Sequence, residues 1–190
     1  MANVFDVLAK DHAEVKQMLS ELEFGPTAAS GADPDQLALR KKMVQQLVIE
    51  ESKHEAVEEM YFWPAVRRQL TEGDDLANQA QDQEQEGKVA LDRLDKLAPE
   101  DEDFETQLAE FISAGRAHIA FEEAMVWPRL RSVLTGTDAD NLGRELEEGK
   151  KTAPTRPHPH TPASPGLLKT AGPAVAAADR LRDAVTGRNE

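Results

Sequence analysis

One pattern of histidine, glutamate and tryptophan occurs twice in this 190-residue chain, sixty-four residues apart. The two copies are His54-x3-Glu58-Glu59-x3-Trp63-Pro64 and His118-x3-Glu122-Glu123-x3-Trp127-Pro128. A repeat of this length indicates two copies of one helical unit. A histidine and a glutamate four residues apart lie one above the other on one face of a helix. Two such faces turned toward each other bring two imidazoles and two carboxylates to one point, which predicts a metal site.

A third histidine, His12, falls on the inward apolar stripe of another helix. A lone histidine on such a stripe is more often a hydrogen-bonded core residue, but three on three helices favour metal ligands. Burying several ionised carboxylates without partners would be very costly, and metal ions remove that cost. Carboxylate and imidazole groups are ligands that iron and manganese accept. His158 and His160 lie in a proline-rich stretch, where we interpret them as solvated linker residues.

The third helix offers a carboxylate in place of a histidine. Aligning His12-x2-Val15 with Glu86-x2-Val89 puts Glu86 in the slot that His12 fills in the first half, so Glu86 is a candidate ligand. The alternative is a surface glutamate. The register of this helix stays open because other polar residues stand close by on adjoining faces, namely Asp82, Gln83 and Glu84.

Tyr61 stands three residues beyond Glu58 on the same predicted helix face. One interpretation is a core tyrosine that packs its ring and hydrogen-bonds its hydroxyl. The other is a catalytic residue that binds or lies beside a second metal, since phenolate is a hard anionic donor that favours ferric iron. Pro64 and Pro128 are expected to kink their helices, with the preceding tryptophans packing at one end of the molecule.

The elements that must position these residues are all helical. Strand signals are nearly absent, while apolar residues recur at spacings of three and four. Four long helices with short connections predict an all-α, up-down antiparallel four-helix bundle over residues 1–135. The predicted helices are Asn3–Glu23, Pro34–Leu70 capped by Asp33, Asp74–Leu97 and Asp101–Leu134. Residues 136–150 predict a short helical extension, and 151–190 a Pro/Ala-rich linker (Thr152–Pro173) and tail with one short helix over Ala174–Val185.

Composition excludes several classes of function. The chain has no cysteine, so disulfides and thiol catalysis are excluded. Residues 1–149 carry a net charge of −18, against +4 for 150–190, and the acidic body argues against nucleic acid as a partner. Without a long apolar run or a signal pattern, we expect a cytoplasmic protein that has no membrane partner. We expect a monomer or small homo-oligomer.

The early D-H-x2-V-x3-L motif around His12, followed by the two His-x3-Glu motifs, resembles hemerythrin-like proteins of the HHE cation-binding type. The resemblance covers roughly residues 3–135. It implies an up-down four-helix bundle with a non-haem centre of two iron ions joined by an oxo or hydroxo bridge. It implies His12 and His54 as terminal ligands of one iron and His118 as a ligand of the other, with Glu58 and Glu122 as bridges.

The chain departs from the oxygen-carrying members of that family, which supply two histidines from the third helix. With Glu86 and Tyr61 in their place, the ligand set is rich in anions, which stabilise the ferric state and disfavour a reversible oxygen carrier. The sequence therefore favours a di-iron centre that decomposes hydrogen peroxide, as a catalase does, or reacts with nitric oxide. One alternative is a sensor or store for oxygen, nitric oxide or iron that does not turn over. Another is an acidic helical interaction protein.

Overall fold

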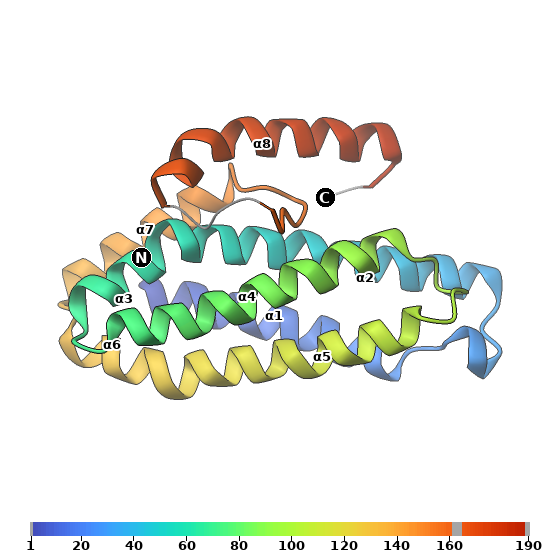
Figure 1. Cartoon of the computed structure of the whole chain (residues 1–190), viewed down its shortest axis with the longest axis horizontal. Coiled ribbons are helices and arrows are strands. Elements are labelled where there is room, and N and C mark those ends of the chain that lie inside the picture. The colour runs from blue at the N-terminus through green and yellow to red at the C-terminus, as the bar shows by residue number, and fades with distance from the viewer. Residues whose placement is uncertain (1, 161–164, 189–190) are drawn as a thin grey trace.

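The computed structural model describes residues 2–160 and 165–188, and every regular element within these ranges is helical, as predicted. Two of the four long rods are single helices, and each of the other two continues through a wider π-helical turn into a short last helix. The rods are α1 (Val4–Phe24), α2–η2–α3 (Pro34–Val57, Glu58–Phe62, Trp63–Gln69), α4 (Gly73–Lys96) and α5–η3–α6 (Phe104–Phe121, Glu122–Val126, Trp127–Val133). A short 3-10 turn, η1 (Ala28–Ser30), lies between α1 and α2. Successive rods lie side by side and run in opposite directions (Figure 1).

The first two rods begin at side-chain caps. Asn3 accepts from the first turn of α1, and Asp33 accepts from Gln36 at the start of α2, where Pro34 needs no hydrogen-bond acceptor. The turn between α3 and α4 is tight, because a Cβ on Gly73 would lie 2.3 Å from the carbonyl oxygen of Val66. Only glycine allows that approach.

The π-helical turns η2 and η3 occupy matching places in the two sequence repeats. Each begins at the second residue of a His-x3-Glu pair and ends just before a Trp-Pro pair. The backbone N–H groups of Trp63 and Trp127 donate five residues back, to the carbonyls of Glu58 and Glu122. Proline has no N–H to donate, so a wider turn accommodates Pro64 and Pro128 while the rod continues.

Two apolar cores fill the space between the rods. The Trp-side core surrounds the π-turns and contains Phe5, Leu8, Phe62, Trp63, Trp127 and Leu130. The Leu-side core contains Leu19, Leu22, Leu47, Leu91, Leu94, Phe104, Leu108 and Phe111. The repeated histidines and glutamates belong to neither core, so they form a separate polar layer within the rods.

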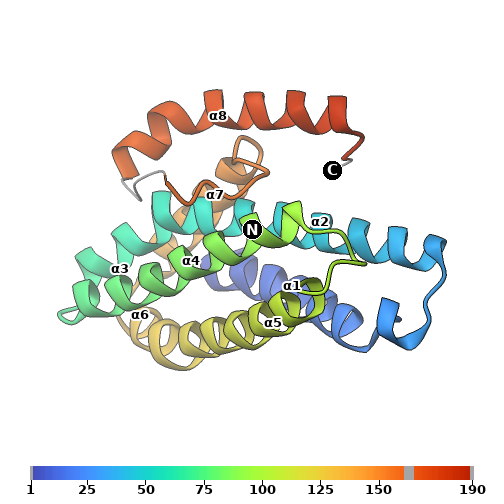
Figure 2. The same cartoon turned by 45° about the vertical axis from the view of Figure 1, so that its right-hand side comes forward.

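Two further helices, α7 (Gly136–Lys150) and α8 (Pro165–Thr186), lie outside the rods. α7 packs along α1, and α8 lies against η2, across one face of the molecule (Figures 1 and 2). α8 begins at Pro165 and continues through Pro173, so it is longer than the helix predicted over Ala174–Val185. Of the predicted linker, 161–164 fall outside the described residues. None of the described helices is long and apolar enough to cross a membrane.

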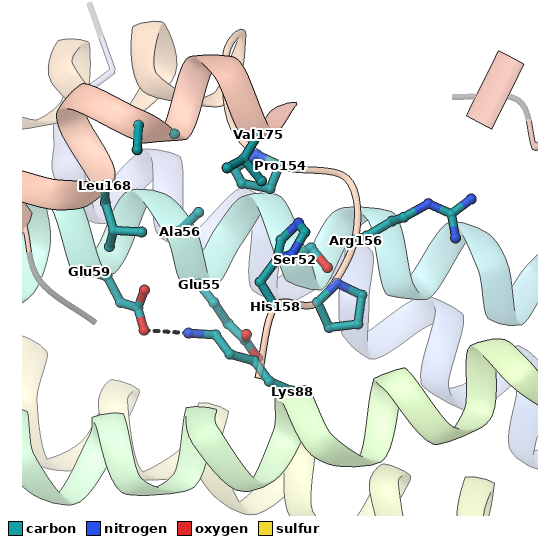
Figure 3. A pocket seen from close by; sticks show the side chains of 13 residues that line it. Ser52, Glu55, Ala56, Glu59, Lys88, Pro154, Arg156, His158, Leu168 and Val175 are labelled. Atoms are coloured by element: carbon teal, nitrogen blue, oxygen red, sulfur yellow. Dashed lines mark hydrogen bonds and ion pairs between the residues drawn. The ribbon is translucent and has the colours of Figure 1, made fainter. Parts of the chain in front are cut away.

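Residues 151–160 pass between α8 and the rods and enclose a small cavity of about 110 Å³. Its walls come from the second rod, α4, the loop and α8, and a Glu59–Lys88 ion pair lies in it (Figure 3). Buried Asp183 of α8 holds the loop, accepting from the Thr155 hydroxyl at 2.6 Å and pairing with Arg156 at 2.6 Å. The tail is thus fastened to the body by buried polar contacts.

Replacing Asp183 by Ala is expected to release the tail, because Arg156 and Thr155 would lose a buried partner at a cost of about 3 kcal/mol. Limited proteolysis should then cut within 151–160 much faster than in the unaltered protein. Asp140→Ala, at an exposed position on α7, serves as the control and should leave the cleavage rate unchanged. Equal cleavage rates in all three proteins would contradict the described docking.

Candidate metal centre

Six side chains from all four rods meet in the polar layer. They form two groups of four, and within each group one ligand atom per residue lies within 4.8 Å of all the others. The groups are His12, His54, Glu58, Glu122 and Glu58, Glu84, His118, Glu122. Glu58 and Glu122 belong to both groups and are fully buried. The cluster thus consists of two adjacent groups of ligand atoms that share two carboxylates.

The atoms of this cluster that could bind a metal lack hydrogen-bond partners. Among the described residues, eight of its buried side-chain atoms make no hydrogen bond: Nε2 of His12, His54 and His118, both carboxylate oxygens of Glu58 and Glu122, and Oε2 of Glu84. Several of these atoms nonetheless lie close together, as with the 3.1 Å between His12 Nε2 and Glu122 Oε2. Buried polar atoms are nearly always satisfied in folded proteins. These residues therefore fit bound cations.

The other ring nitrogen of each histidine has a partner on a neighbouring rod. The pairs are His12 Nδ1 with Glu123 Oε1 (3.0 Å), His54 Nδ1 with Asp11 Oδ2 (3.3 Å) and His118 Nδ1 with Gln83 Oε1 (3.0 Å). Such contacts fix the ring orientation and leave Nε2 free to bind a metal.

Lysines pair in turn with the two carboxylates that contact histidine Nδ1 atoms, those of Glu123 and Asp11. Lys16 donates to Glu123 at 2.7 Å, and Lys150 of α7 pairs with Asp11. Burial would raise the pKa of Asp11, but its contacts with His54 and Lys150 hold the pKa below its usual value. α7 therefore contributes to the support of His54, although it lies outside the four rods.

The two halves of the cluster are related by a shift of 64 residues in the second and fourth rods and 72 residues in the first and third. Under the second shift Asp11 corresponds to Gln83, His12 to Glu84 and Lys16 to Lys88. The contacts repeat in the same way, since Lys88 pairs with Glu59 as Lys16 pairs with Glu123. Glu84 therefore occupies the position equivalent to His12.

The sequence alignment that selected Glu86 is thus two residues out of register. Glu86 lines a neighbouring cavity and belongs to neither group of four. A signal for the right register was present in the sequence. Lys16, Leu19 and Leu22 recur with the same spacing as Lys88, Leu91 and Leu94.

Tyr61 is also placed outside the cluster. Its ring lies over Gly149 of α7, and Lys169 Nζ stands 4.3 Å from the ring centroid. The wide π-turn that begins at Glu58 rotates Tyr61 away from the stripe of His54 and Glu58, and a regular helix would have kept it there. Burial, with a contribution from Glu145, raises the pKa of Tyr61, which disfavours the phenolate.

The tryptophans have different contacts in the two halves. Trp63 donates through Nε1 to Glu84, whereas Trp127 stacks on the His12 ring with centroids 4.8 Å apart. Both contacts orient a member of the cluster, a role beyond the core packing expected from the sequence.

Without a metal, the cluster holds protons. Burial and neighbouring Glu59 raise the pKa of Glu84 to about 8, and burial together with Glu122 raises that of Glu58 well above its usual value. Burial opposes charge on His118, yet Glu122 raises its pKa to about 9. Burial would also raise the pKa of Glu122, but His118 and His12 hold it low. Cations must displace these protons to bind.

The fold and this donor set together define a helical protein that binds cations. Residues 3–130 match the Hemerythrin HHE cation binding domain, and the chain belongs to this family. The family expected from the doubled His-x3-Glu motif is therefore confirmed.

The chain is also similar to two curated proteins and one solved structure. An uncharacterized hemerythrin-like protein of Schizosaccharomyces pombe is 26% identical over 184 residues, covering 96% of this chain and 86% of that protein. A DNA nickase of Nostoc sp. is 22% identical over 148 residues, and the match covers 78% of this chain but only 39% of the nickase. A crystal structure of an HHE cation binding domain-containing protein from Mycobacterium kansasii has a TM-score of 0.65 at 20% identity. That alignment covers 94% of this chain and 99% of the other, and supports the fold.

The protons of the metal-free cluster make a prediction about pH. The pKa of Glu84 rises from 4.5 to about 8 on folding, and that of His118 rises from 6.5 to about 9. At a pH between these two values for each residue, the folded protein keeps a proton that the unfolded chain has released. These contributions to stability are complete below the unfolded values and are lost as the pH rises through the folded ones. The melting temperature of chelator-treated protein should therefore fall between pH 5 and pH 9, by roughly 2–4 °C for each kcal/mol lost. A melting temperature that stays constant or rises over this range would contradict the prediction.

The register of α4 makes a second prediction. Glu84→Gln keeps the side-chain volume and an acceptor for Trp63 but removes a negative donor, so the affinity for the second cation should fall by roughly tenfold or more. Glu86→Gln, two residues away, is the matched control and should bind as the unaltered protein does. Metal titration by calorimetry measures both, and a larger loss in Glu86→Gln would reverse the assignment.

Proposed function

We propose that this chain holds two iron ions within an up-down antiparallel four-helix bundle formed by its four rods. The observation that carries the proposal is the pair of four-residue groups sharing Glu58 and Glu122. His12 and His54 would complete one site, and Glu84 and His118 the other. Glu58 and Glu122 would bridge the two ions.

The two proposed sites are not alike. The first has two histidines, whereas the second has His118 and the carboxylate of Glu84. An extra anionic donor stabilises the ferric state, which disfavours reversible oxygen carriage. We therefore propose that the centre reacts with hydrogen peroxide in the manner of a catalase, or with nitric oxide.

When bound, a pair of iron ions supplies the Lewis acidity and the electrons needed to cleave an O–O bond. The chain's own residues supply the support for this chemistry. The Nδ1 contacts hold the imidazoles in place, and the burial of Glu58 and Glu122 keeps bulk water from their carboxylate oxygens. Glu51 presents a buried carboxyl to the cavity beside the cluster, where it could form a hydrogen bond with a small molecule that enters the cavity.

A second candidate function is a di-iron sensor or store for oxygen, nitric oxide or iron, without turnover. The observation that favours it is the connection from His54 through Asp11 to Lys150 of α7. A change at the centre would reach the C-terminal elements through these contacts. Release of oxygen from peroxide separates the two functions, because a sensor binds its ligand without repeated turnover.

Protein purified from iron-replete cells is expected to carry about two iron ions per chain, as in other helical bundles with paired carboxylates and histidines. It should release oxygen from hydrogen peroxide through many cycles, followed with an oxygen electrode. His54→Ala should lose iron and melt at a lower temperature, because metal binding is linked to folding.

The matched control is His160→Ala in the tail loop, which should keep both iron and melting temperature. Protein that carries no iron and takes none up would contradict the proposed centre. Protein that carries iron but releases no oxygen would leave the sensor or store as the function.

A further inference from the structure

A cavity of about 240 Å³ lies beside the cluster and is lined by residues of all four rods. His12, His54, Glu84 and His118 contribute to its wall, whereas the shared carboxylates of Glu58 and Glu122 do not. The cavity is therefore next to the proposed cation sites rather than the space that the cations themselves would fill.

The cavity exists because of the residues one turn beyond the cluster. This layer has one lining residue from each rod, namely Val15, Glu51, Gly87 and Gly115. Two of the four are glycines, so two rods place no side chain in this layer, and the Glu55 carboxyl lies beside Gly87, 3.3 Å from the position of a Cβ there. A Cβ on Gly115 would make ordinary van der Waals contact with Leu19 at 3.7 Å and with Phe111 at 3.9 Å, so a side chain is tolerated there without a clash.

The lining is polar at the cluster and on the α2 side, where Glu51 and Glu55 lie, and it is apolar on the α1 and α5 sides. Phe111, Ile119 and Val15 supply hydrocarbon walls, and Ala114 and Ala117 are exposed residues of α5 at its edge. These small side chains leave the edge of the cavity between α4 and α5 uncrowded. A molecule with a polar end and an apolar body matches this division.

The volume exceeds what hydrogen peroxide needs. At about 30 Å³ per molecule of liquid water, the cavity corresponds to roughly eight waters. An apolar protein cavity of roughly 150 Å³ is known to hold benzene. Hydrogen peroxide would leave most of this space without protein contacts, whereas a molecule with an aromatic ring or a short branched chain would fill it.

We propose that the centre takes organic hydroperoxides as substrates, with Gly115 setting the size of the organic group. The proposal rests on the peroxide chemistry proposed above. The hydroperoxide group would face the histidines, and the hydrocarbon body would lie against Val15, Phe111 and Ile119.

The reaction balances with hydrogen peroxide as the reductant: ROOH + H₂O₂ gives ROH + H₂O + O₂. The O–O bond of the organic hydroperoxide breaks, and its oxygens take up two electrons and two protons. Hydrogen peroxide loses those two electrons and two protons and leaves as oxygen. No other co-reactant is required.

The test uses iron-loaded full-length protein with cumene hydroperoxide and hydrogen peroxide together. Chromatography measures the alcohol product, 2-phenyl-2-propanol, and an electrode measures oxygen. The unaltered protein should form the alcohol. Gly115→Leu adds four carbon atoms at the wall of the cavity beside Phe111, so the ratio of alcohol formed to hydrogen peroxide consumed should fall by roughly tenfold or more. Ala120→Leu, exposed on the same helix, is the control and should leave that ratio unchanged.

A second measurement does not depend on turnover. Calorimetry of the iron-loaded protein should detect binding of 2-phenyl-2-propanol, and Gly115→Leu should weaken it. If Gly115→Leu fails to fold, Gly115→Ala, whose Cβ makes only ordinary contacts, should give a smaller change in the same direction.

The outcomes separate the two proposals. Hydrogen peroxide consumed without alcohol formation overturns the substrate class and leaves the peroxide function intact. Alcohol binding without any peroxide decomposition overturns the peroxide function, and the organic substrate with it. Equal losses in Gly115→Leu and Ala120→Leu overturn the role of Gly115.

Discussion

The burial of carboxylates at one point is the constraint on which the rest of this structure depends. Glu58, Glu84 and Glu122 lie deep between four rods, where ionised carboxylates without partners are very costly. In the metal-free protein the pKa values of Glu58 and Glu84 rise, so protons offset that cost. Bound cations would offset the same cost while leaving the carboxylates ionised. The same side chains therefore make the empty bundle less stable as the pH rises and make the site selective for positive charge.

The surrounding residues follow from that constraint. Each histidine must point Nε2 at the shared carboxylates, and each does so because an oxygen acceptor on another rod holds its Nδ1. Two of these acceptors, Asp11 and Glu123, are held by Lys150 and Lys16. The bundle therefore contributes more than a scaffold, because every rod carries both a member of the cluster and a group that orients a member on another rod.

The sequence predicted the helices and most of the cluster because a repeat of sixty-four residues and a spacing of four are visible without a structure. It selected Glu86 rather than Glu84 as the α4 member of the cluster because the two residues are chemically alike, and only the Lys-x2-Leu-x2-Leu register separates them. It misplaced Tyr61 because a π-turn changes which residues share a face, and the pattern of apolar residues does not reveal such a turn. The early start of α8 was not predicted because Pro165 and Pro173 lie in a proline-rich stretch, which is typical of a linker.

Between the two near-symmetric halves, the residues of the cluster differ in type at a single position. The backbone, the π-turns, the Lys–Glu pairs and the Trp-Pro pairs repeat, yet His12 corresponds to Glu84. The tryptophans follow this change, since Trp63 donates a hydrogen bond to a carboxylate while Trp127 stacks on an imidazole. An indole N–H suits an anionic acceptor, and an indole face suits a flat ring. The tryptophan contacts thus differ with the member of the cluster that each one touches, and the difference between the two halves extends into the residues around them.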